Sequence, residues 1–98
     1  MRKLGRGGYS VQGEIDLHGM TLAEAKPRLR DFIEYSAQQG HLCVRVVHGK
    51  GLGSGERGPV LKNAVNHWLR RWDNVLAFVS TRQVDGGTGA IYVLLERA

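Results

Sequence analysis

Two short segments carry the residue types that acid–base chemistry requires. Asp16 and His18 lie two positions apart in DLHG, and His48 begins HGKG, which also contains Lys50. A carboxylate beside an imidazole can fix the tautomer of the ring and favour its protonated form, which suits a general acid or base. Two histidines with a lysine could cleave a phosphodiester through a 2′-hydroxyl without a metal. Alternatively, Asp16 and His18 could form a hydrogen-bonded pair that only shapes a turn.

A metal site is a second interpretation of the same residues. Asp16, His18 and His48 could together hold a divalent cation such as Mg²⁺. The spacing matches no dedicated zinc pattern, and the sequence establishes no cofactor. We expect the two other histidines, His41 and His67, to be packed or solvated rather than catalytic.

Glycine-rich segments accompany these residues. HGKGLGSGERG (48–58) and DGGTG (85–89) supply backbone N–H groups that can approach a phosphate closely. The predicted nucleic-acid contacts are Gly49, Gly51, Arg57, Arg82, Gly86, Gly87 and Gly89. GSGERG matches the dinucleotide pattern G-x-G-x-x-G, but the loop is too long for its tight turn and the chain too short for the rest of that fold. A flexible connector is the alternative interpretation of the longer segment.

Composition and charge narrow the class of protein. The 98 residues contain 14 Lys and Arg against 9 Asp and Glu, which gives a net charge of +5. This excess favours polyanionic partners, either nucleic acid or the ribosome. No apolar run is long enough for a membrane span, and the first residues lack the apolar core of a signal peptide. The single cysteine, Cys43, is expected to be a buried apolar residue. We expect a cytoplasmic monomer.

Six predicted elements position the candidate residues. Strands are predicted over residues 11–17, 42–47, 75–80 and 90–96, where apolar residues alternate or form short β-rich runs. Thr21 and Glu24 form a capping box that begins a helix ending near Gly40, and Pro27 should bend that helix. A second amphipathic helix is predicted over residues 60–72.

The order β-α-β-α-β-β predicts an α/β fold, a two-layer α/β sandwich with a four-stranded mixed sheet and two helices. We assign residues 11–98 to this domain and residues 1–10 to a flexible basic arm. Helical crossovers favour parallel neighbours, so the first three strands should run the same way and the fourth should return antiparallel. The segments that leave the first three strands should then meet at one sheet edge, where such folds tend to place their sites.

These motifs together resemble the small MutS-related (Smr) domain family. The matching segments are IDLHGMT (15–21), EA (24–25), HGKG (48–51), GPVLKNAVNHWL (58–69) and DGGTGAIYVLL (85–95), and the resemblance covers roughly residues 11–97. It implies a compact two-layer domain that associates with nucleic acid. In several branches it implies endonuclease activity on DNA or RNA, including messenger RNA on ribosomes, whereas other members bind without cutting. It also implies that Asp16 and His18 are functional residues and that residues 48–51 contribute to binding or catalysis. Pro27 departs from the family's helix geometry.

Two functions remain open from the sequence. The leading hypothesis is an endonuclease in which Asp16 orients His18 as the acid or base and His48 is the complementary acid or base. In this hypothesis Lys50 and the glycine amides bind the phosphate and stabilise the transition state. The alternative is a non-catalytic nucleic-acid or ribosome-binding module, which the net charge and the basic arm favour. A nucleotide-binding regulator is a third, weaker interpretation.

Overall fold

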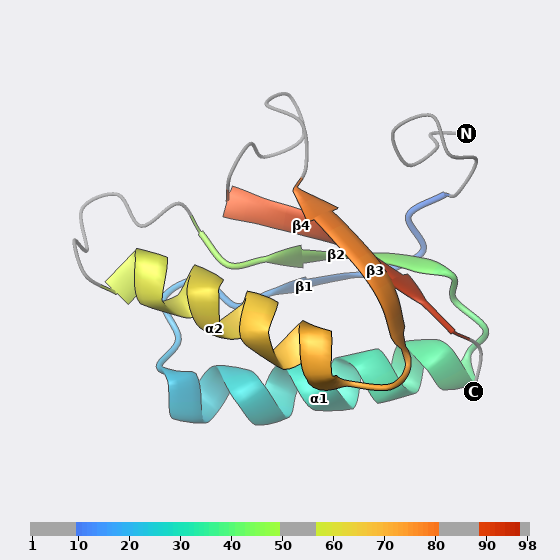
Figure 1. The fold of residues 1–98 in the computed structure, drawn as a ribbon, viewed down its shortest axis with the longest axis horizontal. Coiled ribbons are helices and arrows are strands. Elements are labelled where there is room, and N and C mark those ends of the chain that lie inside the picture. Colours follow the sequence, from blue (N-terminus) through green and yellow to red (C-terminus); the bar gives the residue numbers. More distant parts are fainter. Residues whose placement is uncertain (1–9, 50–56, 81–88, 97–98) are drawn as a thin grey trace.

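The computed structural model describes residues 10–49, 57–80 and 89–96 (Figure 1). Its elements follow the predicted β-α-β-α-β-β order. They are β1 (Glu14–Asp16), α1 (Leu22–Gln38), β2 (Cys43–Val47), α2 (Arg57–Arg71), β3 (Val75–Ser80) and β4 (Ala90–Leu95). The predicted α/β fold is therefore confirmed, although β1 is shorter than the predicted strand.

The four strands form one mixed sheet in the order β1-β2-β4-β3. β1 pairs in parallel with β2, with Ile15 opposite Val46, and β4 is antiparallel to both β2 and β3. β1, β2 and β3 therefore share one direction, as predicted. β4 lies between β2 and β3. Because β4 is antiparallel to β2, the carboxyl end of β2 lies beside the amino end of β4.

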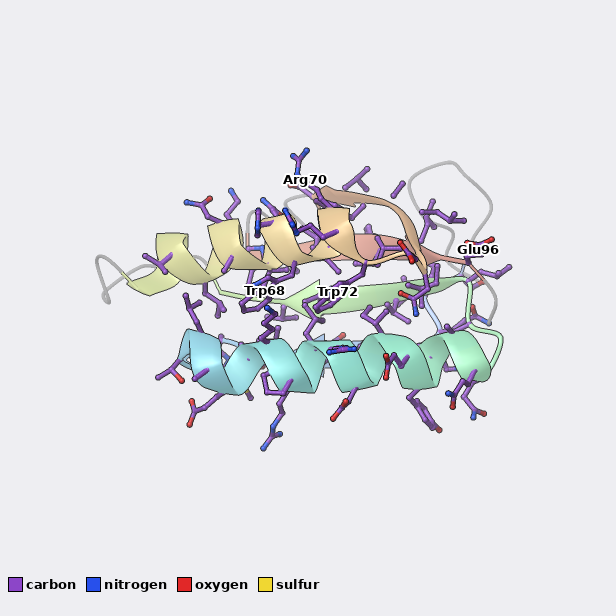
Figure 2. All side chains as sticks on the ribbon, turned by 60° about the horizontal axis from the view of Figure 1, so that its bottom comes forward. Trp68, Arg70, Trp72 and Glu96 are labelled. Carbon is purple, nitrogen blue, oxygen red and sulfur yellow. The ribbon has the colours of Figure 1, made fainter. Side chains whose placement is uncertain are left out.

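The hydrophobic core lies between the sheet and the two helices. Leu29 and Ile33 of α1 and Val65 and Leu69 of α2 are almost fully buried, and they pack with buried sheet residues that include Val93. Figure 2 shows Trp68 and Trp72 between the two helices. The two helices are amphipathic, and no helix in the described ranges is long and apolar enough to cross a membrane.

The start of α1 is fixed by the predicted capping box. The Glu24 backbone N–H donates to Thr21 Oγ1 at 3.2 Å, and the Thr21 backbone N–H donates to Glu24 Oε1 at 3.1 Å. These bonds satisfy two backbone donors that a helix start leaves free. α1 then runs through Pro27 without interruption and ends before Gly40, whose φ is +79°. The cap thereby fixes the position at which α1 begins after the segment DLHG.

Candidate functional site

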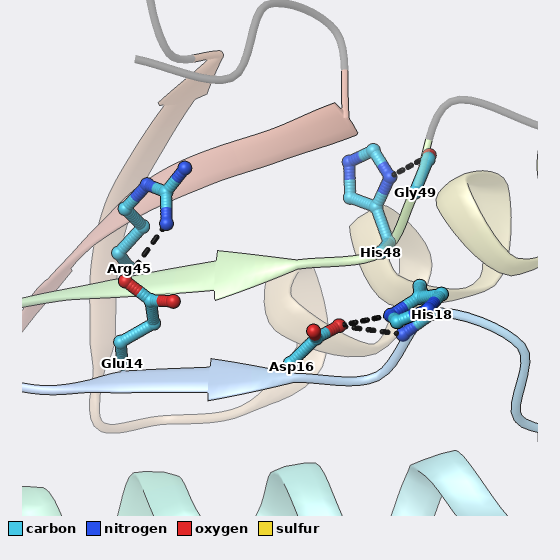
Figure 3. Close-up of polar contacts among 6 residues, drawn as sticks. All are labelled: Glu14, Asp16, His18, Arg45, His48 and Gly49. Carbon is cyan, nitrogen blue, oxygen red and sulfur yellow. Dashed lines mark hydrogen bonds and ion pairs between the residues drawn. The ribbon is translucent and has the colours of Figure 1, made fainter.

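Asp16 and His18 form a hydrogen-bonded pair at the end of β1 (Figure 3). Asp16 Oδ1 accepts hydrogen bonds from His18 Nδ1 at 2.7 Å and from the His18 backbone N–H at 3.0 Å. The hydrogen bond from the His18 side chain is the main cause that lowers the pKa of Asp16, so this carboxylate stays ionised. An ionised carboxylate only accepts, so Nδ1 carries the proton and Nε2 is the ring nitrogen left for another partner.

The pair is accessible because the local backbone turns its side chains outward. Leu17, between the two residues, is fully buried in the core, and its backbone N–H donates to the Val47 carbonyl at 2.7 Å. The chain then turns through Gly19, whose φ is +80°. The side chains of His18 and Asp16 remain 70% and 52% exposed. A ligand the size of a nucleic-acid strand can therefore reach them from solvent.

His48 lies at the end of β2, in a more buried environment than that of His18. Its ring is only 1% exposed, and its Nδ1 donates to the Gly49 carbonyl at 2.8 Å. Nε2 is also buried, and it has no hydrogen-bond partner within the described ranges. Burial lowers the pKa of His48, so the neutral ring is favoured. A role as complementary acid or base stays a prediction, and it would have to use Nε2.

Gly49 brings the two motif segments into direct contact. A Cβ atom at Gly49 would lie 3.1 Å from His18 Cβ, and the φ of Gly49 is +87°. Both the close approach and the left-handed backbone favour glycine at this position. The backbone N–H groups of His48 and Gly49 donate to the Gly89 carbonyl at 2.9 and 3.0 Å. The predicted meeting of these segments at one sheet edge is therefore present.

Several predicted contact residues cannot be placed at this edge. Lys50, Gly51, Arg82, Gly86 and Gly87 lie outside the described residues. Arg57 is the first residue of α2, and its side chain also lies outside the description. Of the predicted glycine contacts, the structure places Gly49 against His18, and Gly89 against His48 and Gly49. The Gly49 N–H donates to the Gly89 carbonyl, so it is not free for the predicted phosphate contact. A phosphate contact by the other residues stays a prediction.

The described residues do not form a metal site. They contain no cluster of three or more His, Cys, Asp or Glu side chains suited to hold a metal ion. Mg²⁺ prefers several oxygen ligands, whereas Asp16 is the carboxylate that contacts His18 among the described residues, and one of its oxygens already accepts two hydrogen bonds. The other two histidines also lie elsewhere: His41 is half-buried after α1, and His67 is exposed on α2.

The sequence interpretation missed Arg45 as a neighbour of the site. Arg45 Nη1 lies 2.8 Å from Glu14 Oε1, and the two residues pair across β2 and β1. Its positive charge also contributes to the lowered pKa of Asp16. A charged residue inside the apolar run CVRVV was the signal that could have identified it. Arg45 therefore joins the electrostatic surroundings of the candidate site.

The comparison with protein families agrees with these motifs. The family model for the Smr domain matches residues 15–96. This chain belongs to the Smr domain family. The Smr domain of Thermus thermophilus MutS2 has a similar structure, with a TM-score of 0.75 and 33% identity over 87% of this chain and 99% of that one. Escherichia coli YdaL, a stand-alone small MutS-related protein, has a TM-score of 0.82 and 28% identity over 93% of this chain and 70% of that one.

Curated relatives add a second similarity. This Smr domain is 36% identical over 97 residues to the ribosome rescue factor SmrB of Tolumonas auensis, covering 99% of this chain and 52% of that protein. It is also 36% identical over 95 residues to the ribosome rescue factor SmrB of Escherichia coli, covering 97% of this chain and 49% of that protein. The chain therefore spans about half the length of the curated relatives that it matches.

Proposed function

We propose that this Smr domain binds RNA at the ribosome. The observation that carries the proposal is the similarity to ribosome rescue factors, which extends over almost all of this chain. The net charge of +5 supports it, because a basic protein is attracted to the phosphates of ribosomal and messenger RNA. The exposed Asp16–His18 edge, with the Gly49 backbone beside it, is the proposed contact with the RNA strand.

A second candidate function is cleavage of the bound RNA, and the geometry of one pair favours it. A binding surface for phosphates gains nothing from a carboxylate, yet Asp16 is ionised and holds His18 in one tautomer. In that tautomer Nε2 of His18 can accept the proton of a 2′-hydroxyl as the oxygen attacks phosphorus. The phosphorus–oxygen bond to the next nucleotide then breaks, and the departing 5′-oxygen takes a proton from water, which leaves a 2′,3′-cyclic phosphate and a free 5′-hydroxyl. The His18 imidazolium returns its proton to the hydroxide formed from that water. This route requires RNA, since DNA has no 2′-hydroxyl.

One experiment tests both functions. Purified ribosomes would be sedimented with the 98-residue chain over a range of salt concentrations, and the same mixtures would be analysed for cut RNA with and without EDTA. We expect salt-dependent sedimentation, and cleavage that the Asp16→Ala/His18→Ala variant loses. Asp31→Ala is the matched control, because Asp31 is exposed on α1 and its removal changes the net charge at neutral pH by the same amount.

The outcomes separate the two functions. Failure of the wild-type chain to sediment with ribosomes at low salt contradicts the proposed RNA binding. Sedimentation without any cut RNA leaves a binding domain and excludes cleavage under those conditions. Cleavage at an unchanged rate in the Asp16→Ala/His18→Ala variant excludes the proposed role of His18.

A further inference from the structure

α2 has the charge pattern of a helix that binds a polyanion. Its sequence, RGPVLKNAVNHWLRR, contains four cationic residues and no acidic residue. The exposed polar side chains recur at helical spacing and can all donate hydrogen bonds: Asn63, His67, Arg70 and Arg71. Val60, near the start of the helix, is exposed and apolar. Lys62 and Asn66 are half-buried and flank this stripe. We call the four exposed polar residues the α2 face.

The other helix lacks this pattern. α1 carries three cations, Lys26, Arg28 and Arg30, but it also carries the acids Glu24, Asp31 and Glu34. Arg30 lies 3.6 Å from Glu34, one turn further along the helix. The charges of α1 therefore balance, and the positive charge of the helical layer is concentrated on α2.

The arginines of the α2 face are exposed to solvent, and one of them contacts an aromatic ring. None of the ion pairs among the described residues involves a residue of α2. The Arg70 guanidinium lies over the Phe78 ring, 5.8 Å from its centre, and Figure 2 shows Arg70 pointing away from α1. Arg71 lines a groove between the helices in which the cations Lys26 and Arg30 and the acids Glu34 and Asp73 also lie. Both arginines are therefore exposed to solvent, and no carboxylate of the described residues forms an ion pair with them.

The α2 face is also continuous with the candidate site. Figure 1 shows that α2 begins at the sheet edge where β1 and β2 end and then runs back beneath β3. Lys62 is close enough to His48 for its charge to contribute to the lowered pKa of that ring. A helix of 15 residues is about 22 Å long, equal to about seven stacked nucleotides at ~3.4 Å each. One strand could contact both the site and the far end of α2.

We propose that the α2 face binds the phosphate backbone of the RNA strand that occupies the Asp16–His18 edge. Guanidinium groups match phosphate geometry, and amide and imidazole groups hydrogen-bond to sugars, phosphates and base edges. Continuity with the site favours a single RNA strand over a separate partner. The inference deepens the proposed function and rests on the proposed binding of RNA.

Two double variants of equal charge test the inference. Arg70→Gln/Arg71→Gln removes two cations from α2, and Arg28→Gln/Arg30→Gln removes two exposed cations from α1. Their affinities for unstructured oligouridine would be measured across a salt series, with melting temperatures as a check on folding. For an RNA of about 12 nucleotides, the α2 variant should lower the slope of log affinity against log salt by about 1.4, and the α1 variant should lower it less. For an RNA of about three nucleotides, which is too short to reach from the site to Arg70, neither variant should differ from wild type.

The possible results separate the inference from the proposed function. Equal salt slopes for the two variants would contradict RNA binding by the α2 face. A loss of affinity for the short RNA equal to the loss for the long RNA would contradict it as well. Neither result would contradict the proposed binding of RNA by the domain. If the α2 variant binds both RNAs with the affinity and salt slope of the wild-type chain, RNA binding by the α2 face is likewise contradicted. If the wild-type chain binds neither RNA nor ribosomes, the proposed function itself is wrong and the inference falls with it.

Discussion

His18 is held from two sides, by a hydrogen bond and by a backbone contact. Asp16 Oδ1 accepts from its Nδ1, and the Gly49 backbone lies against its Cβ. A side chain on a surface turn would otherwise sample several rotamers. The two contacts restrict the imidazole and leave Nε2 as the ring nitrogen available to a ligand. The HGKG segment therefore contacts His18 through the backbone of Gly49.

Gly19 and Gly49 make a matched pair for testing this backbone contact. Both have left-handed φ angles, +80° and +87°. A Cβ atom at Gly49 would lie 3.1 Å from His18 Cβ, whereas one at Gly19 would have nothing within 4 Å beyond its two neighbours in the chain. Alanine at either position should lower the free energy of unfolding by about 1–2 kcal/mol because of the backbone conformation. Only Gly49→Ala should also displace His18 and impair RNA binding or cleavage. Chemical denaturation and the ribosome assay would measure the two effects, and equal functional losses would contradict this account.

The buried ring of His48 makes stability depend on pH in a definite direction. Its pKa in the folded chain lies below the ordinary value of 6.5, so the unfolded chain binds more protons below that pH. This contribution to stability is complete above about pH 6.5 and is lost as the pH falls from there towards the pKa of the folded chain. His48→Asn keeps an N–H donor near the Gly49 carbonyl but cannot titrate, so it should reduce the loss of stability on the acid side. Urea denaturation between about pH 5 and about pH 8 would measure the difference.

The control for His48 is another histidine in a different environment. His67 is exposed on α2, so His67→Asn removes one titratable ring without disturbing the core. The wild-type chain and His67→Asn should lose stability in parallel as the pH falls. A curve for His48→Asn that follows the other two would show that burial of His48 does not govern the pH dependence.

Among the elements, α1 tolerates a residue that its backbone disfavours. Pro27 lies in the sixth position of the helix and donates no hydrogen bond to the preceding turn. Pro27→Ala restores that donor at an exposed position. It should raise the free energy of unfolding by about 2 kcal/mol, the helical gain of about 3 less about 1 for the added freedom of the unfolded chain. Thermal and urea denaturation would test this, with Arg28→Ala expected to change stability by less than about 0.5 kcal/mol. An unchanged or lower stability for Pro27→Ala would contradict the prediction.

The elements were predictable where local patterns determine them. The capping box fixes the start of α1, and short β-rich apolar runs identify β2, β3 and β4. The amphipathic pattern predicts a start of α2 at residue 60, three residues later than the start in the structure. The structure includes Gly58 and Pro59 in the first turn, where a missing N–H removes no helical hydrogen bond.

The burial of His48 was not predictable from local patterns. A histidine that follows a strand and precedes glycines has the appearance of an exposed loop residue. Its burial depends on β4 lying beside β2, a pairing between segments more than 40 residues apart. The rule for parallel strands did predict that DLHG and HGKG would share one edge. It could not predict that the backbone of Gly49, rather than the ring of His48, would contact His18.

At the scale of the whole molecule, the positive charge is unevenly distributed along the chain. Residues 1–10 contain Arg2, Lys3 and Arg6 and no acid, and α2 contains four cations and no acid. The rest of the chain therefore carries more acidic than basic residues. Attraction to RNA should come mainly from these two segments, and the Asp16–His18 pair should contribute to chemistry or register more than to affinity.

Deletion of residues 1–10 tests this division at neutral pH. It lowers the net charge from +5 to +2, because three cations are removed, whereas Val11, which packs near Cys43 and Tyr92, is retained. If the three cations each contact a phosphate, the slope of log affinity against log salt should fall by about 2 for single-stranded RNA. Asp16→Ala/His18→Ala should leave that slope almost unchanged, since the cations expected to pair with phosphates lie in residues 1–10 and α2. Titration of labelled RNA between about 50 and about 200 mM salt would measure both slopes. An unaltered slope in the shortened chain would assign the electrostatic attraction to the folded domain alone.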